Sequence, residues 1–212
     1  MLSKRLTSIT KFIDKDDEVV DVGCDHGLLS IYLYENKLCK RIIASDVNKN
    51  ALNNAISNIN KKNLDIETVL SDGIVSVNMK NINTLVISGM GTSTILHILS
   101  DSNKLENVTK IVLQSNNEHS RLRKDMNKLG YYLLDEDIIY ENKKYYVTMN
   151  FEKSTKKNSK SVLNYGIVKK EFVEYYKYLE NSLYDILVKI PKKRVLTRIK
   201  LKLQINKYKN II

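Results

Sequence analysis

A glycine-containing turn at Asp21–Gly27 is the feature that most constrains what this chain can fold into. The turn ends the short apolar run Glu18–Val22, which has the composition of a buried strand, and it leads into Leu28–Glu35, which predicts a helix. A strand that breaks at a Gly-x-x-x-Gly turn and opens a helix lets the backbone approach a nucleotide-like ligand closely. The sequence therefore predicts a ligand site at this turn.

The spacing of the glycines narrows the class of ligand. Dinucleotide sites use Gly-x-Gly-x-x-Gly, and phosphate-binding loops carry the lysine of Gly-x-x-x-x-Gly-Lys-Ser/Thr, but this turn has neither pattern. Asp21 stands two residues before Gly23 and no lysine lies in the turn, which suits a ligand with positive charge better than a pyrophosphate. S-adenosylmethionine, a nucleoside with a sulfonium and an ammonium group, is such a ligand. A dehydrogenase and a phosphate-binding protein are the less favoured alternatives.

Composition excludes several other classes of protein. No apolar run approaches the roughly 20 residues that cross a bilayer, and the first residues lack the apolar core and cleavage site of a signal peptide. Cys24 and Cys39 make neither a disulfide framework nor a zinc site, and no group of His, Cys or acidic residues has the spacing of metal ligands. We therefore expect a cytoplasmic protein with no metal and no membrane partner. The composition leaves the oligomeric state open, and we expect a monomer.

Positive charge is concentrated at the C-terminal end of the chain. Residues 1–160 hold 23 Lys and Arg against 20 Asp and Glu, whereas residues 161–212 hold 12 against 4. A basic tail on a near-neutral body is typical of a module that binds a polyanion such as nucleic acid. A solvated helical surface in a lysine-rich proteome would give the same counts, and we favour the nucleic-acid interpretation over it.

Short apolar runs alternate with amphipathic segments through most of the chain. The expected strands cover residues 18–22, 41–45, 66–70, 84–88 and 111–114. The expected helices cover residues 28–35, 49–60, 92–99 and 119–129. This alternation indicates crossover units and a parallel sheet covered on both faces. Two further runs, at 131–139 and 144–151, flank a turn signal at Glu141–Lys143 and predict an antiparallel hairpin. The expected fold class is α/β, with the seven-stranded sheet typical of Rossmann-like methyltransferases.

The C-terminal part has a different pattern. Residues 153–160 are polar and predict a linker. From Val168 to Ile190 apolar residues recur every three or four positions, which predicts one face of a long helix. After an interruption at Pro191–Lys193, a second helix has two possible inward faces, Leu196, Ile199 and Leu203 or Leu201, Ile205 and Tyr208. We expect these helices to form a coiled-coil-like antiparallel hairpin, and we interpret the apolar stripe as a packing seam rather than a cofactor site. The predicted domains are residues 1–160, Rossmann-like, and 161–212, a basic helical hairpin.

Acidic residues lie at the ends of three successive strands of the predicted sheet. Asp21 can meet the ammonium of the ligand, Asp46 lies near the twenty-residue offset at which an acid binds ribose hydroxyls, and Asp72 can accept a hydrogen bond from an adenine amine. An Asp at a strand end is also a common helix cap or turn former. Because all three stand beside the same glycine turn, we favour a nucleoside site over capping alone.

A second glycine loop, Ser88–Thr92, follows the fourth expected strand. Ligands of open α/β sheets bind beyond the carboxyl ends of the strands, so this loop should lie over the methyl donor. A tight turn that starts the next helix is the alternative interpretation. The predicted cofactor-binding residues are Asp21, Gly23, Gly27, Asp46, Val47, Asp72, Gly73, Ser88, Gly89 and Met90.

Several of these motifs occur in an order that resembles a known family. They are Ser3–Leu6, Asp21-x-Gly-x-Asp25-His26, Ser88–Gly91, Leu113–Asn116, Arg121-x-Arg123 and the C-terminal helical hairpin. Over essentially its whole length the chain resembles the bacterial tRNA adenine N1-methyltransferases of the TrmK type. The resemblance implies methyl transfer from S-adenosylmethionine to N1 of the adenine at position 22 of tRNA.

The chain departs from that family pattern at three positions. Thr92 stands where a glycine is usual, Ser115 where a proline is usual, and Gly27 where an alanine is common. None of the three changes removes a functional group that the chemistry needs. We therefore expect them to affect affinity rather than reaction type.

The reaction that the resemblance implies is a direct displacement at the methyl carbon. N1 of adenine has an in-plane lone pair, so catalysis consists mainly of alignment and of stabilising the charge that develops on the base. Asp25 is the first catalytic candidate for that stabilisation, and His26 is the alternative, as an orienting group or proton acceptor. A purely structural hydrogen bond from His26 stays open as well.

An adenine in folded tRNA must be unstacked before its N1 can be reached, and basic side chains offset that cost through phosphates. Gln114 and Asn116 can pair with the adenine edge or bond within their own loop. The predicted substrate-binding residues are Lys4, Arg5, Gly91, Gln114, Asn116, Arg121, Arg123, Lys192, Lys193 and Arg194, with Arg198, Lys200 and Lys202 as further candidates. Two rivals stay open: a methyltransferase of another RNA or of a small molecule, and a non-catalytic RNA-binding protein on the same fold.

Overall fold

The computed structural model describes residues 2–211, apart from the side chain of Ser102. Met1 and Ile212, which end the two expected domains, lie outside these residues. The chain divides into two compact units, Met1–Gly166 and Ile167–Ile212. The first unit extends past the expected boundary at residue 160 because helix α6 (Lys160–Tyr165) packs against helix α5 (His119–Lys128).

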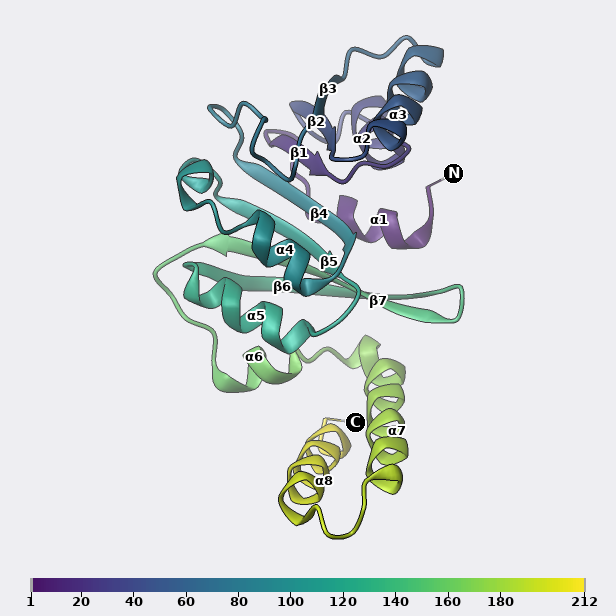
Figure 1. The fold of residues 1–212 in the computed structure, drawn as a ribbon, viewed down its shortest axis with the longest axis vertical. Helices are drawn as coiled ribbons and strands as arrows, with labels where there is room; N and C mark the ends of the chain where they lie inside the picture. Colours follow the sequence, from purple (N-terminus) through teal and green to yellow (C-terminus); the bar gives the residue numbers. More distant parts are fainter. Residues whose placement is uncertain (1, 212) are drawn as a thin grey trace. The chain divides into compact units, whose positions relative to one another are not determined.

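The first unit is built on one seven-stranded sheet with the strand order β3-β2-β1-β4-β5-β7-β6 (Figure 1). Its strands are β1 (Glu18–Val22), β2 (Arg41–Asp46), β3 (Glu67–Leu70), β4 (Thr84–Met90), β5 (Lys110–Ser115), β6 (Tyr131–Glu141) and β7 (Lys144–Lys153). The pairs among β1 to β5 are parallel, and β7 is antiparallel to both β5 and β6. This topology confirms the expected Rossmann-like methyltransferase sheet.

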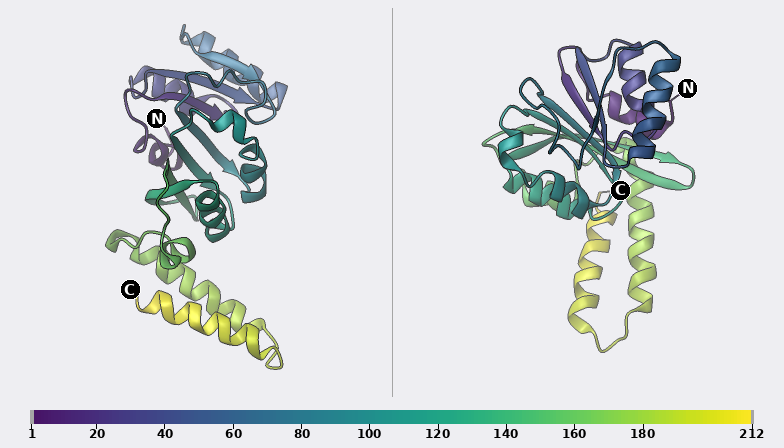
Figure 2. Two further views of the ribbon diagram at one scale, coloured as in Figure 1. Left: turned by 90° about the vertical axis from the view of Figure 1, so that its left-hand side faces the viewer. Right: turned by 45° about the horizontal axis from the view of Figure 1, so that its top comes forward.

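The central strands are buried on both faces, which explains their continuous apolar sequences. All six residues of β5 are buried, and so are four of the five residues of β1. Besides α6, the same unit contains the helices α1 (Lys4–Thr10), α2 (Leu28–Glu35), α3 (Lys49–Lys61), α4 (Thr92–Ile98) and α5. Side chains of α1, α2 and α3 share one core cluster with Val19, Val86 and Val112 of the sheet. The helices α4 and α5 lie on the other side of the sheet (Figure 2).

The two glycine turns start helices as the sequence predicts. Gly27 is the N-cap residue of α2 and has a positive φ of 69°, a conformation that favours glycine. The strand β4 runs two residues further than expected, to Met90, because the pairing with β5 shifts register between Ser88 and Met90. Such a bulge changes the direction of a strand locally, and it lies next to the predicted cofactor loop.

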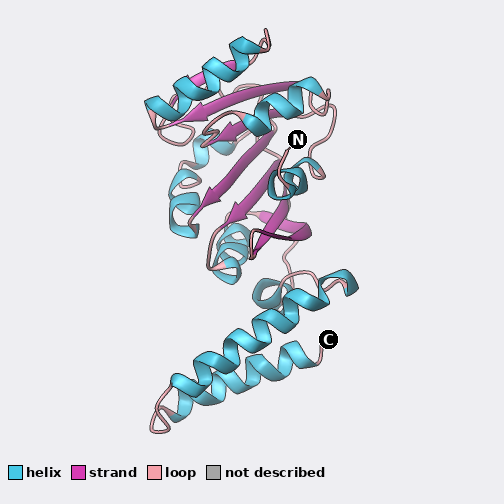
Figure 3. Ribbon diagram, turned by 90° about the vertical axis from the view of Figure 1, so that its right-hand side faces the viewer, coloured by secondary structure: helices cyan, strands magenta, loops and turns pink. Residues whose placement is uncertain are grey.

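The second unit is a pair of antiparallel helices, α7 (Val173–Lys189) and α8 (Val195–Lys209), joined by a short turn (Figure 3). Ile205 is buried and the Tyr208 ring stacks on the Tyr176 ring at 6.4 Å between centroids. The structure therefore selects the face of Leu201, Ile205 and Tyr208, whereas Leu196, Ile199 and Leu203 are exposed by 77%, 48% and 64%. The guanidinium of Arg198 donates to the carbonyls of Leu187 and Ile190, which satisfies the C-terminal end of α7.

Two short 3₁₀ helices, η1 (Ser102–Leu105) and η2 (Lys170–Phe172), complete the regular elements. Helices α1 and α6 were not predicted, and each has fewer than eight residues. Between residues 2 and 211, none of the helices combines the length and the apolar character that a membrane span requires.

Candidate active site

A pocket of about 540 Å³ lies at the carboxyl ends of β1, β2 and β4. Its volume is in the range of about 300–1,000 Å³ that is typical of small-molecule sites. Most of the predicted site residues of these strands line it together, namely Asp21, Gly23, Asp25, His26, Asp46, Ser88, Gly89 and Met90. Arg5 and Asn116, which were predicted as substrate contacts, also line the pocket. The ends of three strands thus bring residues that are far apart in the sequence to one place.

Asp21 is buried at the pocket wall and is only 2% exposed. Its carboxylate accepts a hydrogen bond from the Ser30 hydroxyl at 2.7 Å. The pKa of Asp21 is raised to about 6, because burial and, to a smaller extent, the negative charge of Asp46 outweigh the bond from Ser30 and the charge of Arg5, which both lower it. A cation next to Asp21 would therefore stabilise the ionised carboxylate, which burial alone makes unfavourable.

Asp46 is held by the backbone at the end of β2. One carboxylate oxygen accepts from the Asp25 amide at 3.0 Å and the other from the Asn48 amide at 2.8 Å. A carboxylate has about four acceptor positions, so this arrangement leaves further lone pairs free for ligand hydroxyls. The side chain is therefore fixed in direction, as a ribose-binding acid requires.

The glycines of the pocket lie where a side chain would collide with or crowd a neighbouring residue. A Cβ atom on Gly23 would lie 2.3 Å from Cε of Met90, and the φ of Gly23 is +75°. A Cβ on Gly89 would lie 3.3 Å from Nη1 of Arg5. The Gly23 turn and the Gly89–Met90 loop therefore approach each other across the pocket, where backbone must come close to a ligand.

Asp25 and His26 stand at the mouth of the pocket rather than deep inside it. Their side chains are 71% and 53% exposed, and the Asp25 carboxylate lies 3.7 Å from Nε2 of His26. Asp25 has a φ of 51°, the left-handed conformation that non-glycine residues seldom adopt. Such backbone strain persists only where the surrounding structure imposes it, and it orients the Asp25 side chain toward the opening. Their catalytic role stays a prediction.

Gln114 lines the interior and does not reach the pocket. It is 1% exposed, and its amide nitrogen donates to the Thr148 hydroxyl at 2.8 Å and to the Arg5 carbonyl at 3.2 Å. Its amide oxygen accepts from Nη1 of Arg5 at 3.3 Å. The expected pairing of Gln114 with the adenine edge therefore has to be corrected, because these bonds use its polar atoms to hold Arg5 in place.

Asn116, Lys144 and Tyr146 form a polar and aromatic part of the pocket wall. Nδ2 of Asn116 donates to the Gly89 carbonyl at 2.6 Å, and its Oδ1 accepts from Lys144 at 3.4 Å. Nζ of Lys144 lies 5.2 Å from the centre of the Tyr146 ring, and the Arg5 guanidinium carbon lies 5.7 Å from it. Sequence reasoning missed Lys144 and Tyr146, since only the pairing of β7 with β5 brings them to the pocket.

Arg123 was predicted to contact the substrate, but the structure buries it. It is 4% exposed, and its guanidinium pairs with the carboxylate of Glu136 at 2.7 Å. A buried, paired arginine cannot reach a phosphate without breaking that ion pair, so its role is structural. Arg121 is exposed on α5, where it pairs with Glu118 at 3.0 Å and lies 3.7 Å from Asp125.

Other predicted residues lie outside the lining of this pocket. Gly27 packs against Ala55, and Gly91 is the N-cap residue of α4. Val47 is 66% exposed after β2, and Asp72 and Gly73 follow the edge strand β3. Lys4 lines a neighbouring groove. Lys192, Lys193 and Arg194 are exposed in the turn of the second unit.

The two departures from the family pattern at Thr92 and Ser115 contact each other. Their hydroxyl oxygens are 2.9 Å apart, and both residues are buried. Thr92 also donates through its hydroxyl to the Asn117 carbonyl at 2.7 Å, and its amide donates to the Asn117 side chain at 2.9 Å. Thr92 therefore lies behind the loop rather than in the pocket. The pair ties the start of α4 to the end of β5.

The described residues include no group of three or more His, Cys, Asp or Glu placed to hold a metal ion. His119 is buried and its ring nitrogen contacts the Ser115 carbonyl at 3.0 Å. Burial lowers the pKa of His119 to about 4, with a smaller contribution from the charges of Arg123 and Lys144. His119 is therefore neutral near pH 7 and stabilises the loop.

The chain is similar to known methyltransferases. A family model described as a methyltransferase domain matches residues 2–149. The tRNA (adenine(22)-N(1))-methyltransferase of Bacillus subtilis is 30% identical over 148 residues, which span 68% of this chain and 62% of that protein. The aligned part thus covers less than two thirds of the length of this curated relative.

Two solved structures match over nearly the full length. Sp1610 of Streptococcus pneumoniae, assigned as a tRNA (m1A22) methyltransferase, is 30% identical with a TM-score of 0.92 and covers 100% of this chain and 99% of its own. TrmK of M. capricolum, solved with S-adenosyl-homocysteine, is 29% identical with a TM-score of 0.85, over 99% of this chain and 97% of its own. The chain therefore belongs to the methyltransferase-domain family, in the group that contains the TrmK proteins.

Proposed function

We propose that this protein is a cytoplasmic enzyme that transfers a methyl group from S-adenosylmethionine to N1 of an adenine in tRNA, at position 22. The observation that carries the proposal is the pair of buried or fixed carboxylates, Asp21 and Asp46, at the ends of adjacent strands beside the close approach of Gly23 to Met90. The relatives named above support the same assignment.

The residues of the pocket fit each part of the cofactor. Asp46, with lone pairs left after its two backbone bonds, would hold the ribose hydroxyls. Asp21 would face the ammonium group, whose charge favours the ionised carboxylate. Gly23 and Gly89 carry no side chain that would crowd Met90 and Arg5, so that their backbone could lie close to the ligand. When bound, the cofactor supplies an electrophilic methyl group.

The target base would enter from the side of Asp25 and Tyr146. The Tyr146 ring offers a stacking surface, and such stacking offsets part of the cost of unstacking the base. The exposed Asp25 carboxylate would stabilise the positive charge that develops on the adenine as N1 attacks. Asn116, fixed to the Gly89 carbonyl, would meet the base edge. His26, 3.7 Å from Asp25, would orient that carboxylate.

Basic residues in the pocket and elsewhere on the surface would hold the rest of the RNA. Arg5 lines the pocket, Arg121 is exposed on α5, and Lys192, Lys193 and Arg194 are exposed in the turn of the helical hairpin. Contacts of this kind bind phosphates without reading sequence, so they position the tRNA rather than select the base.

The proposal is tested by incubating the protein with unmodified tRNA transcripts and labelled methyl donor and then mapping the modified base. We expect label on N1 of adenine at position 22 and none on free nucleosides. Methylation at a carbon or at a ribose oxygen would contradict the displacement chemistry. Turnover on nucleosides alone would favour a small-molecule enzyme, and cofactor binding without turnover on any tRNA would favour a non-catalytic RNA-binding protein.

A further inference from the structure

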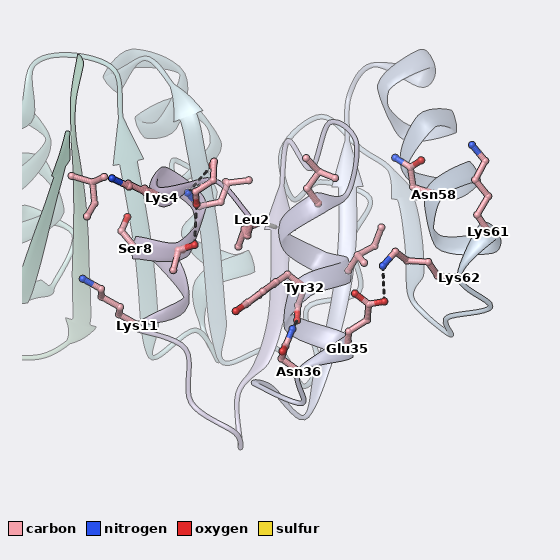
Figure 4. Close-up of a pocket in the computed structure, with 16 residues that line it drawn as sticks. Leu2, Lys4, Ser8, Lys11, Tyr32, Glu35, Asn36, Asn58, Lys61 and Lys62 are labelled. Atoms are coloured by element: carbon pink, nitrogen blue, oxygen red, sulfur yellow. Dashed lines mark hydrogen bonds and ion pairs between the residues drawn. The ribbon is translucent and has the colours of Figure 1, made fainter. Parts of the chain in front are cut away.

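A second cavity, larger than the active-site pocket, lies between helix α1 on one side and helices α2 and α3 on the other (Figure 4). Its volume is about 1210 Å³. This exceeds the range of about 300–1,000 Å³ that is typical of sites for a small molecule. We call it the α1–α3 groove, and its size suits an extended ligand.

The rim of the α1–α3 groove is basic. Lys4 of α1 and Lys11, which follows α1, line it on one side, and Lys61 and Lys62 at the C-terminal end of α3 line it on the other. Among the residues that line it, Glu35 carries the single negative charge, and Glu35 pairs with Lys62 at 2.6 Å.

Two of these four lysines are free to bind an anion. Lys11 pairs with Asp137 at 2.7 Å, so its charge is already matched, as is that of Lys62. Within residues 2–211, Lys4 and Lys61 have no ion-pair partner. Exposed, unpaired ammonium groups on opposite walls of one groove suit a ligand with several negative charges along its length.

The inner surface of the groove is mostly apolar. Leu2, Leu6, Leu28 and Ile31 line it, and Leu28 is 53% exposed although it is a large apolar residue. The half-buried ring of Tyr32 points from α2 across the groove toward α1 (Figure 4). Proteins that bind single-stranded nucleic acid combine an aromatic ring, on which an unpaired base stacks, with basic side chains that bind its phosphate. The groove has both, with Tyr32 on its apolar surface and lysines at its rim.

The α1–α3 groove is continuous with the active-site pocket. Leu6 and Leu28 line both of them. A strand that places one base in the pocket must continue on either side of that base, and past these two leucines it enters the groove directly. A free phosphate would satisfy the lysines but would leave the apolar floor and the Tyr32 ring without a role.

We propose that the α1–α3 groove binds an unstacked segment of RNA next to the target base. Lys4 and Lys61 bind its phosphates, and Tyr32 stacks on one of its bases. The identity of the RNA rests on the proposed function, but the groove itself is argued from its lysines, its tyrosine and its continuity with the pocket. The groove thus adds a binding site outside the cofactor pocket and outside the basic helical hairpin.

Three variants test the groove: Lys61→Glu, the double variant Lys4→Glu with Lys61→Glu, and Tyr32→Leu. Lys80→Glu is the matched control, because Lys80 is also exposed but lies in the loop before β4, at the opposite end of the sheet. All are compared with the wild type for thermal unfolding, for the Kd of S-adenosylmethionine by calorimetry, and for the Kd of tRNA transcripts at several salt concentrations.

We expect the double variant to bind tRNA at least tenfold more weakly, with a salt slope reduced by about two because two phosphate contacts are lost. Tyr32→Leu should weaken RNA binding about fivefold or more through lost stacking and should leave the salt slope unchanged. Cofactor affinity and thermal unfolding should stay within error of the wild type. Lys80→Glu should behave as the wild type in each measurement.

A cross-linking experiment locates the RNA directly. Transcripts with 4-thiouridine on either side of the methylated nucleotide are irradiated with the wild-type protein, and the attached peptide is identified. Cross-links to residues 28–36 or 58–62 support the groove. Unchanged tRNA affinity in the lysine variants, or cross-links only to other residues, would overturn the proposed RNA site in the groove. Methylation of tRNA by the wild-type protein would still support the enzyme assignment in that case. If no tRNA is methylated, the affinity comparison decides about the groove by itself.

Discussion

At the scale of single residues, the two carboxylates of the pocket differ in their hydrogen bonds and in their burial. Asp46 accepts hydrogen bonds from two backbone amides, which fix the direction of its side chain at the end of β2. Asp21 accepts only the Ser30 hydroxyl among the described side chains and is fully enclosed, so its charge is costly until a cation arrives. Asp46 is therefore suited to bind hydroxyl groups, and Asp21 is suited to bind a cation.

The state of Asp21 predicts a pH dependence of cofactor binding. Its pKa is raised to about 6, so the carboxyl is mostly neutral at pH 5 and mostly ionised above pH 7. If the ionised form holds the ammonium group, the affinity for S-adenosylmethionine should rise about tenfold between pH 5 and pH 7.5 and then level off. Calorimetry across this range checks it, and Asp21→Asn should bind weakly with no such rise. A flat profile for the wild type would contradict the role of Asp21.

The same shift has a consequence for stability. A carboxyl whose pKa is higher in the folded than in the unfolded protein stabilises the fold below its unfolded pKa, near 3.8, and this stabilisation is lost as the pH rises through about 6. Asp21→Asn should therefore raise the melting temperature of the ligand-free protein at pH 7.5 and change it little at pH 4. A lower melting temperature at pH 7.5 would mean that the bond from Ser30 outweighs the burial of charge.

The contact between Thr92 and Ser115 is testable by a double-mutant cycle. Thr92→Val keeps the shape but removes the buried hydroxyl that bonds Ser115 and the Asn117 carbonyl, so it should cost about 1–3 kcal/mol of unfolding free energy. Ser115→Ala should cost a similar amount, and the double variant less than the sum. Denaturant unfolding measures the cycle, with Thr155→Val on the exposed segment after β7 as the control. Additive effects would show that the two hydroxyls do not depend on each other.

At the scale of elements, helix α1 is held at the pocket by the far end of the β6–β7 hairpin. Its first amides, of Lys4 and Arg5, donate to the carboxylate of Glu141 at 2.9 and 3.2 Å. An acidic side chain at a helix N-terminus satisfies free amides and matches the helix dipole. Since α1 carries Arg5 into the pocket and Lys4 into the groove, Glu141 links a distant hairpin to the site.

Removing that carboxylate should loosen α1. We expect Glu141→Ala to increase hydrogen exchange of residues 4–10 at least tenfold while the central strands keep their protection, because only a local contact is lost. Hydrogen exchange with mass spectrometry gives both readings in one experiment, and Glu152→Ala, exposed on β7, is the control. Unchanged exchange in α1 would mean that its buried residues Ser8 and Ile9 hold it without Glu141.

The elements also show what the sequence can and cannot specify. The strands were predicted closely because their β-branched, continuously apolar runs are a local signal of burial, as in β1 and β5. Helix α1 was missed because its position depends on Glu141, more than 130 residues away in sequence. For the second helix of the hairpin, both apolar faces have the same period, so only the packing of Ile205 and Tyr208 against α7 distinguishes them.

The site residues that belong to one sequence motif could be predicted. Those that tertiary contacts bring to the pocket or bury away from it could not. Asp21, Gly23 and Asp46 belong to strand ends whose position follows from the alternating pattern. Gln114 and Arg123 have the chemistry of ligand-binding residues, but their burial depends on the partners Thr148 and Glu136 in the terminal hairpin. Tyr146 carries no motif and reaches the pocket only because β7 returns beside β5.

At the scale of the whole molecule, charge is divided between a near-neutral sheet unit and a strongly basic helical hairpin. The division predicts that RNA affinity and cofactor affinity can be changed separately. Replacing Lys192, Lys193 and Arg194 together by Glu should weaken tRNA binding at least tenfold and lower the salt slope by about three, with unchanged calorimetry for the cofactor. Loss of both affinities together would contradict separate roles.

The central claim is that carboxylates at the ends of adjacent parallel strands bind a sulfonium nucleoside. The most direct measurement is calorimetric titration of S-adenosylmethionine and S-adenosyl-homocysteine into the wild-type protein and into Asp46→Ala, with Asp65→Ala, exposed on the loop before β3, as the control. We predict one binding site for each compound in the wild type and in Asp65→Ala, and affinity at least tenfold weaker in Asp46→Ala. Absence of heat from either compound with folded wild-type protein, or full affinity in Asp46→Ala, would contradict the claim.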